Sequence, residues 1–317
     1  VEHGVGVANG SDAILLALRA LGLGPGDEVI VPAFTFFATA GSVSRTGATP
    51  VFVDIDPVTY NLDCEDVKKR LTSRTRAIIV VHLYGLPADM HGVMAIAEAH
   101  GLFVVEDAAQ AIGARYGNQP VCSIGHVGAL SFFPTKNLGC YGDGGMVVTR
   151  DAEIAEKTRI LRAHGSKPKY YHSMLGINSR LDALQAAILL AKLPYLERWI
   201  IRRREIAALY SEYLSGIADL QLPRETPGCY HVYHQYTIRS GRRDELQASL
   251  KSKGIGSSVY YPLALHLQQV YADLGYSEGD LPKAEQATRE VLSLPMFPEL
   301  TDDEVYEVAV AVREALG

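Results

Sequence analysis

A lysine that follows an apolar segment and a proline is the first residue in this sequence that could do chemistry. Lys136 lies in the string SFFPTKNLG, which runs from Ser131 to Gly139. A lysine held in such a turn is partly removed from water, which lowers the pKa of its amine and makes the amine nucleophilic. A lysine alone in a loop is usually just solvated, so Lys136 indicates catalysis only in company with other groups.

An acidic residue at the end of an apolar strand supplies the second group. Asp107 follows the strand expected over 102–106 (LFVVE). Carboxylates at the C-terminal ends of parallel strands face the usual ligand crevice. A pyridinium nitrogen needs such a carboxylate to stay protonated and act as an electron sink. The alternative is an Asp that caps the next segment; if that segment is helical, Gln110 lies one turn further on, near the same site.

Two further motifs suit a ligand with a phosphate and a flat ring. Gly10 and Ser11 lie in the turn NGSD, between an expected strand and an expected helix. A helix N-terminus presents free N–H groups to a phosphate, although a plain capped helix has the same pattern. Phe36, after the strand at 28–31, is placed to stack on a ring.

Composition narrows the classes of protein. The chain has 317 residues, 48% of them hydrophobic, with a net charge of −6 and a pI of about 5.9. These values are typical of a globular protein and argue against a nucleic-acid or membrane-surface binder. The four cysteines form no CxxC pair and the histidines no HExxH motif, so we expect no disulfide framework, no metal site and a reducing cytoplasm. No signal peptide or membrane-spanning run is evident.

The hydrophobic pattern predicts an α/β fold. Up to about residue 111, short apolar runs alternate with helices of ten or more residues, which indicates a mostly parallel sheet covered by helices on both faces. Beyond it the expected elements are strands at 129–133, 145–149 and 230–239, helical segments over 151–215 interrupted by a loop at 164–178, and helices at 242–253, 281–292 and 302–316. We therefore expect a large domain over 1–193 and a smaller α+β domain over 194–317, which begins with a long linking helix.

The motifs occur in the order phosphate turn, ring-stacking aromatic, pyridinium partner and lysine. In this combination the chain resembles the DegT-type aminotransferases, a sugar-modifying branch of the fold type I enzymes that use pyridoxal 5′-phosphate (PLP). The matching strings are ANGSDAILLALRALGLGPGDEVIVPAFTF, GATPVFVDIDPVTYNLD, HLYGLPADM, VVEDAAQAIGA, SFFPTKNLGCYGDGGMVVT, NSRLDALQAAIL and SLPMFPEL. They cover almost the whole chain.

The resemblance implies a role for each matching residue. Lys136 would carry PLP as a Schiff base, and Asp107 would hold the pyridine nitrogen. The other positions that match cofactor-contacting residues are Gly10, Ser11, Phe36, Gln110, Ser131 and Asn178. Asn178 resembles a residue that reaches the phosphate of the neighbouring subunit, which implies a homodimer with its site at the interface. We extend the comparison to Arg180 as a clamp for the donor carboxylate, since its planar fork suits carboxylates, and to Tyr260, which replaces a frequent His in the substrate pocket.

The resemblance also implies a reaction. The family transfers an amino group from L-glutamate, through pyridoxamine phosphate, to a keto sugar attached to a nucleoside diphosphate. The products are 2-oxoglutarate and an amino sugar for polysaccharide or glycoside biosynthesis. The strings SFFPTKNLGCYGDGG and HVYHQYTIR, together with Gln110, favour a 3-keto over a 4-keto sugar.

Three alternatives compete with this interpretation. The dehydratase branch of the family has His where this chain has Lys136, so the lysine argues against it. A PLP-binding regulator or pseudoenzyme would keep the cofactor residues without amino transfer. An inactive fragment is the third, because the family normally has a few dozen residues before the position of Val1 and we expect N-terminal sequence to be missing here.

Overall fold

A seven-stranded sheet lies at the centre of this computed structural model, which describes residues 1–317. The strands follow the spatial order β1 (His3–Val7), β9 (Gly145–Thr149), β8 (Val127–Ser131), β5 (Phe103–Asp107), β4 (Thr75–Val81), β2 (Glu28–Pro32) and β3 (Thr49–Val53). Only β9 runs against the others, since it pairs antiparallel with both β8 and β1. The expected mostly parallel sheet is confirmed.

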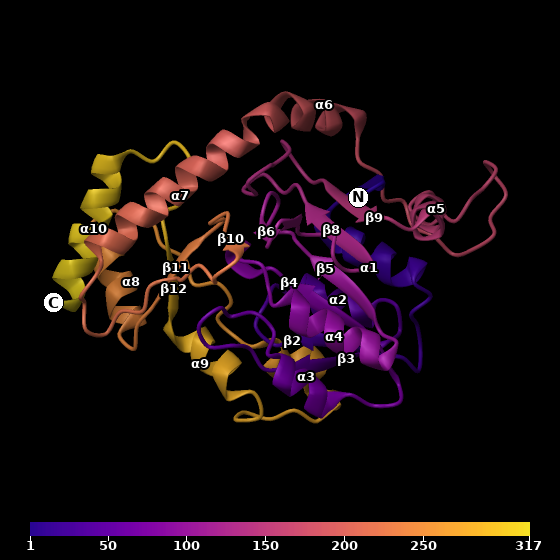
Figure 1. Cartoon of the computed structure of the whole chain (residues 1–317), viewed down its shortest axis with the longest axis horizontal. Helices are drawn as coiled ribbons and strands as arrows, with labels where there is room; N and C mark the ends of the chain where they lie inside the picture. The colour runs from indigo at the N-terminus through magenta and orange to yellow at the C-terminus, as the bar shows by residue number, and fades with distance from the viewer.

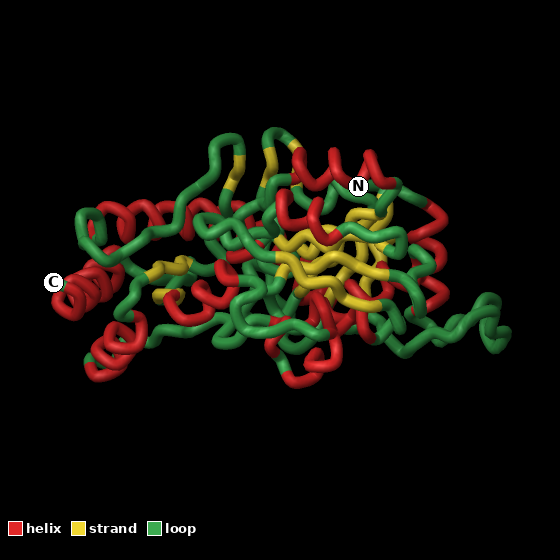
Figure 2. The backbone as a smooth tube through the Cα atoms, turned by 90° about the horizontal axis from the view of Figure 1, so that it is seen from below, coloured by secondary structure: helices red, strands yellow, loops and turns green.

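Helices cover both faces of the sheet, as Figures 1 and 2 show. On one face lie α1 (Gly10–Ala20), α2 (Ala38–Ser44) and α5 (Ala152–Leu161), and on the other α3 (Cys64–Arg70) and α4 (Met90–His100). Successive residues of the central strands point to opposite faces. Accordingly, the side chain of Ile79 packs in the hydrophobic core beneath α1, α2 and α5, whereas Ile78 and Val80 pack in the core beneath α3 and α4.

Helix starts follow their capping residues closely. Asn9 caps α1 by accepting a hydrogen bond from the backbone N–H of Asp12 at 2.8 Å. Asp63 caps α3 in the same way, through the N–H of Glu65 at 2.9 Å. A side-chain oxygen at these positions satisfies an N–H that has no partner inside the helix.

A C-terminal unit packs beside the sheet. It consists of α7 (Leu196–Tyr213), α8 (Arg243–Ser252) and α10 (Asp302–Leu316) around the antiparallel pair β11 (Tyr236–Arg239) and β12 (Val291–Leu294). Helix α6 (Ala183–Lys192) and the short turn η2 (Leu193–Tyr195) lead into α7, so that a long helical arm links the two parts along the top of Figure 1.

Two expected elements are wrong in extent. The helix expected to reach residue 292 ends earlier, as α9 (Pro282–Glu290), because the following residues form β12 against β11. The strand expected over 230–239 is interrupted: its first part is β10 (Cys229–Tyr230), which pairs with the short strand β6 (Arg115–Tyr116), itself paired with β7 (Gln119–Pro120).

Residues 264–291 return to the large sheet. This segment contains η3 (Leu265–Leu267), η4 (Gln269–Leu274) and α9, and its apolar side chains, among them Leu265 and Tyr271, belong to the same core as α1 and β2. The connection between β4 and α4 includes the turn η1 (Leu83–Gly85). None of the helices combines the length and apolar character needed to cross a bilayer.

Candidate active site

A cleft of about 1110 Å³ opens between the C-terminal edge of the sheet and the C-terminal unit. Such a volume is slightly above the range of about 300–1,000 Å³ that is usual for small-molecule sites. Eight of the ten residues expected from the sequence line it: Gly10, Ser11, Phe36, Asp107, Gln110, Ser131, Lys136 and Tyr260. Asp107 and Ser131 meet here because they end the neighbouring parallel strands β5 and β8.

Lys136 lies in a tight turn after β8. The turn is closed by the N–H of Lys136 donating to the carbonyl of Phe133 at 2.9 Å and that of Cys140 donating to the carbonyl of Phe132 at 2.8 Å. The lysine amine has no hydrogen-bond or ion-pair partner in the chain, and burial lowers its pKa to about 8, although the charge of Asp107 works in the opposite direction. With a pKa of about 8, about a tenth of the amine is uncharged and nucleophilic at pH 7, far more than for a solvated lysine.

Asp107 is a buried carboxylate that forms no ion pair. It is 5% exposed, and its oxygens accept hydrogen bonds from the Thr39 hydroxyl at 3.0 Å and the Ala109 N–H at 3.1 Å. Burial raises the pKa of Asp107, and these hydrogen bonds and the charge of Lys136 only partly offset the effect. Asp107 has no ion-pair partner within the chain. It is therefore suited to pair with the protonated ring nitrogen of PLP, which would supply the missing positive charge.

The N-terminus of α1 forms a cradle with the end of β8. A Cβ atom built on Gly10 would lie 2.7 Å from Cβ and 3.0 Å from Oγ of Ser131, so no side chain fits between them. Ser11 lines the same corner of the cleft. The close approach leaves backbone N–H groups and two hydroxyl groups beside the positive end of the helix, which suits the phosphate of PLP.

Aromatic side chains line another part of the cleft wall. Phe36 is 59% exposed in the cleft, and its ring centre lies 6.4 Å from that of Tyr261. It is therefore available to stack on a ring, whereas Phe34 is 1% exposed and packs in the core.

Gln110 is held between two tyrosines rather than in a helix. Residues 108–114 form turns, so the helix that would place Gln110 one turn after Asp107 does not form, although Gln110 does lie in the same cleft. Its side-chain oxygen accepts from the N–H of Tyr84 at 2.7 Å, and its amide donates to the hydroxyl of Tyr261 at 2.9 Å. These contacts fix the orientation of the amide beside Asp107.

Asn178 and Arg180 lie outside the cleft of their own chain. Both are exposed, at the end of the loop 164–178 that extends from α5 in Figure 1. Asn178 forms an isolated bridge with Ala163 at the base of this loop. Neither side chain contributes to the site within one copy of the chain.

Two residues to which the sequence motifs gave no role, Thr39 and Tyr261, also belong to the site, together with His234. Thr39 supports Asp107, Tyr261 supports Gln110, and His234 forms part of the wall. Thr39 and Tyr261 lie close in sequence to Phe36 and Tyr260, but only the fold shows which way their side chains point.

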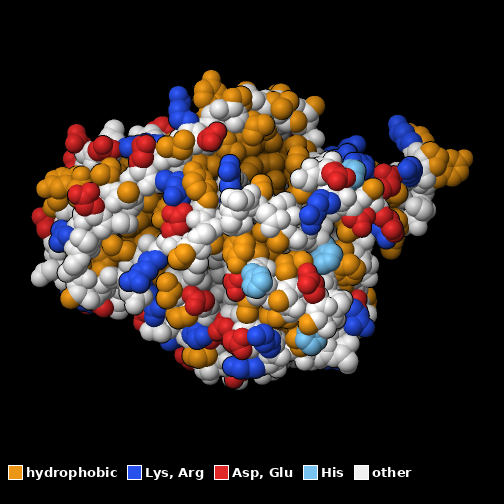
Figure 3. Space-filling view, in the orientation of Figure 1, with side chains coloured by type: hydrophobic (Ala, Val, Ile, Leu, Met, Phe, Trp, Pro, Cys, Tyr) orange, Lys and Arg blue, Asp and Glu red, His pale blue; other side chains and the backbone are white.

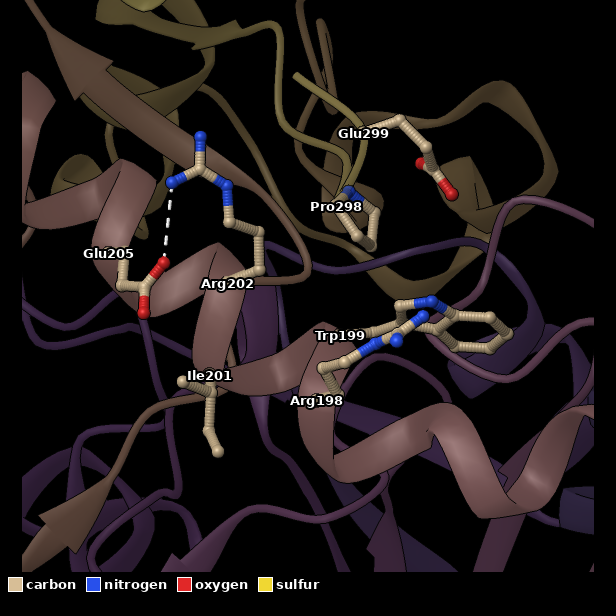
Figure 4. A pocket seen from close by; sticks show the side chains of 7 residues that line it. All are labelled: Arg198, Trp199, Ile201, Arg202, Glu205, Pro298 and Glu299. Carbon is tan, nitrogen blue, oxygen red and sulfur yellow. Dashed lines mark hydrogen bonds and ion pairs between the residues drawn. The ribbon is translucent and has the colours of Figure 1, made fainter. Parts of the chain in front are cut away.

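A second, smaller hollow lies on the outer surface of α7. It measures about 380 Å³ and is lined by Arg198, Trp199, Ile201, Arg202, Glu205, Pro298 and Glu299 (Figure 4). The charge of Arg202 is neutralised by Glu205 at 3.3 Å and Asp302 at 2.7 Å. This hollow offers no nucleophile or uncompensated buried charge, so it lacks the groups that the larger cleft brings together.

The comparisons with known proteins agree with this geometry. A sequence model described as the DegT/DnrJ/EryC1/StrS aminotransferase family matches residues 1–313. The chain belongs to this family. It is accordingly a PLP-dependent aminotransferase, with the fold type I architecture expected from the sequence.

Three relatives illustrate the similarity. A pleiotropic regulatory protein of Geobacillus stearothermophilus is 60% identical over 99% of this chain and 85% of its own length. A UDP-N-acetyl-3-dehydro-α-D-glucosamine 3-aminotransferase of Acidithiobacillus ferrooxidans is 53% identical over 100% of this chain and 85% of its own length. The crystal structure of Streptomyces venezuelae DesV in complex with a ketimine intermediate superposes with a TM-score of 0.97, at 49% identity, over 99% of this chain and 85% of that chain.

Proposed function

We propose that this aminotransferase moves an amino group from L-glutamate to the keto carbon of a nucleotide-linked 3-keto sugar. The observation that carries the proposal is the unpaired, partly buried Lys136 amine in one cleft with the unpaired carboxylate of Asp107. Bound PLP supplies an electron sink at the carbon that exchanges the amino group.

The residues of the chain have separate tasks in this reaction. Gly10, Ser11 and Ser131 would hold the phosphate, and Phe36 and Gln110 would orient the ring. Asp107 would keep the ring nitrogen protonated, because a buried carboxylate stabilises a neighbouring cation. Lys136 would bond to the cofactor and, when displaced by the donor, act as the general base that carries the proton from the donor Cα.

The choice of acceptor rests on the relatives and on Gln110. The relative from Acidithiobacillus ferrooxidans is named as a 3-aminotransferase of a UDP-linked keto sugar, and a Streptomyces venezuelae relative that is 50% identical is named as a dTDP-3-amino-sugar transaminase. The cleft is large enough for a cofactor with a sugar beside it, and Tyr260 is 37% exposed at its wall. We assign Tyr260 to the sugar, and we assign Arg180, which lies outside the cleft of its own chain, to the donor carboxylate in the partner's site.

Assays with purified protein test the acceptor. PLP, L-glutamate and either a UDP- or dTDP-linked 3-keto sugar or its 4-keto isomer are incubated with the enzyme, and the sugar product is identified by mass spectrometry and NMR. The proposal expects amino sugar from the 3-keto substrate. Faster product formation from the 4-keto isomer would overturn the 3-keto assignment.

We also propose that the enzyme works as a homodimer in a reducing compartment. The exposed Leu184 and Leu190 of α6 and the nearby Tyr141 and Tyr195 are 73%, 69%, 75% and 49% exposed. Hydrophobic side chains gather along the same upper edge in Figure 3, and such patches mark protein interfaces. Across that interface Asn178 would reach the partner's phosphate cradle. All four cysteines are unpaired, in keeping with reducing conditions.

A regulatory role is the second candidate function. The observation that favours it is the name of the 60% identical relative, a pleiotropic regulatory protein. A regulator that keeps PLP without turnover would bind the cofactor and show no loss of the visible absorbance band when L-glutamate is added. Conversion of that band to the pyridoxamine form would argue against a purely regulatory protein.

A further inference from the structure

His234 is a cleft residue to which the reaction described above assigns no task. It lies just before β11 and is 8% exposed, yet it lines the cleft together with Lys136 and Asp107. Its ring nitrogen Nδ1 lies 3.2 Å from the side-chain oxygen of Asn137. Nε2 has no partner in the chain.

Asn137 determines which ring nitrogen of His234 carries the proton. The amide nitrogen of Asn137 donates to the carbonyl of Val232 at 3.3 Å, so its amide oxygen must face the imidazole. An amide oxygen only accepts hydrogen bonds, and Nδ1 of His234 is therefore the protonated nitrogen. Nε2 then carries the lone pair. Burial lowers the pKa of His234, and the nearby charges of Lys136 and Arg203 lower it further, so the ring remains neutral.

Asn137 is also the polar link between the lysine turn and the C-terminal part of the chain. Among residues 132–140, it is the one whose side chain forms hydrogen bonds, and both of these reach the segment 232–234. The turn itself is compact, since a Cβ on Gly139 would lie 2.5 Å from the carbonyl oxygen of Pro134. A shift of Asn137 would therefore move the adjacent Lys136.

The segment that carries His234 is anchored independently of the lysine turn. The buried guanidinium of Arg203, on α7, donates to the carbonyl oxygens of Tyr233 and His234, each at 3.2 Å. On the other side, the N–H of Gln235 donates to the carbonyl of Tyr84 at 3.3 Å. The backbone at His234 is therefore held in place, and the hydrogen bond from its ring can fix the position of the Asn137 side chain.

We propose that His234 is a positioning residue for Lys136: it holds Asn137 through Nδ1–H and presents an uncharged acceptor, Nε2, to the cleft. The chain of contacts from Arg203 through His234 and Asn137 would keep the lysine amine aimed at the cofactor. Because the imidazole of His234 is uncharged, Asp107 is the group that would pair by charge with the pyridine ring of the cofactor.

Three substitutions of His234 separate its functions. H234L removes both nitrogens. H234N keeps an N–H near the position of Nδ1, and H234Q places an amide near the position of Nε2. H231L is the matched control, because His231 is also buried in this segment and hydrogen-bonded through Nδ1, to the N–H of Tyr233 at 3.0 Å, but does not contact Asn137.

The test uses the full-length chain from which the cofactor has been removed. PLP is added back, its attachment to Lys136 is followed by visible absorbance, and equilibrium dialysis gives the affinity for PLP. Misplacing a reacting group by about 1 Å slows a reaction by up to about 100-fold, so we expect H234L and H234Q to lower the attachment rate constant by about 10- to 100-fold. H234N should restore it to within about threefold of wild type, with PLP affinity nearly unchanged in all variants.

Two outcomes would overturn the proposal. One is an attachment rate in H234L that equals that of H231L, which would make His234 an ordinary buried residue. The other is equal impairment of H234N and H234L while H231L behaves as wild type, which would show that the hydrogen bond to Asn137 does not matter. Neither outcome depends on the amino donor or the sugar, so a failure here is distinguishable from a failure of the proposed substrate.

Discussion

The hydroxyl of Thr39 lies 3.0 Å from Oδ2 of Asp107 and donates a hydrogen bond to it. Thr39 comes from α2 and Asp107 from the end of β5, so two separate elements fix this buried carboxylate. The hydrogen bond favours the charged form of Asp107 and also limits its rotation. It thereby holds the carboxylate at the wall of the cleft, where the ring nitrogen of the cofactor is expected.

Substitution of Asp107 should affect catalysis more strongly than substitution of Thr39. Because D107N removes the charge, we expect the rate of the reaction with L-glutamate to fall by at least about 100-fold, as for other lost electrostatic groups. T39V removes only the supporting hydrogen bond, worth about 1–3 kcal/mol, and should cost about tenfold. Rapid-mixing absorbance measurements would give both rates. A larger loss in T39V than in D107N would contradict the assigned roles.

Replacement of Lys136 should abolish covalent attachment of PLP. Since no other residue of the cleft carries an amine, K136A is expected to bind PLP without forming a bond and to show no turnover. Mass spectrometry after borohydride reduction would reveal the missing adduct. K69A, at an exposed lysine on α3, is the control and should remain labelled. An adduct of normal yield in K136A would refute the assignment.

The attachment of PLP should depend on pH with a midpoint near the pKa of Lys136, about 8. Burial disfavours the ammonium form in the folded protein, and only the neutral amine attacks. The attachment rate should thus increase about tenfold per pH unit below pH 8 and level off above it. The lowered pKa also means that the folded state gains stability as pH rises between the folded and the unfolded values. A midpoint near 10.5 would show that the lysine is solvated.

A side chain at position 10 should weaken the phosphate site. In G10A the added methyl group would lie 2.7 Å from Cβ of Ser131, so the cradle must open. Overpacking costs about 1–3 kcal/mol, which corresponds to about 5- to 150-fold weaker PLP binding by dialysis. G24A is a suitable control because its Cβ would meet nothing closer than 3.8 Å. Unchanged affinity in G10A would place the phosphate elsewhere.

Complementation between two inactive variants would test the role of Asn178 across the dimer. A heterodimer of K136A and N178A contains one site with both residues intact if Asn178 serves the partner's site. With random assembly, about half of the dimers are heterodimers, and one of the two sites in each is intact. Co-expression should therefore restore about one quarter of the active sites that the same amount of wild-type protein has. The same mixture would stay inactive if Asn178 acted within its own subunit. N178A alone must first show a clear loss of activity.

The sequence by itself determined the type of fold and most of the site residues. The apolar run that becomes β5 predicted a buried parallel strand, and the turn NGSD correctly predicted the start of a helix. Such signals are local, because they depend on propensity and hydrogen bonding within a few residues. The motif containing Lys136 was recognisable for the same reason.

Only the tertiary structure decided which residues meet. It directs Thr39 to Asp107, Tyr261 to Gln110 and His234 to Asn137, over separations of 68, 151 and 97 residues. It also turns the end of the expected last-but-one helix into β12, because pairing with β11 outweighs local helical preference. Contacts between distant segments depend on packing of the whole chain, which no local pattern of residues encodes.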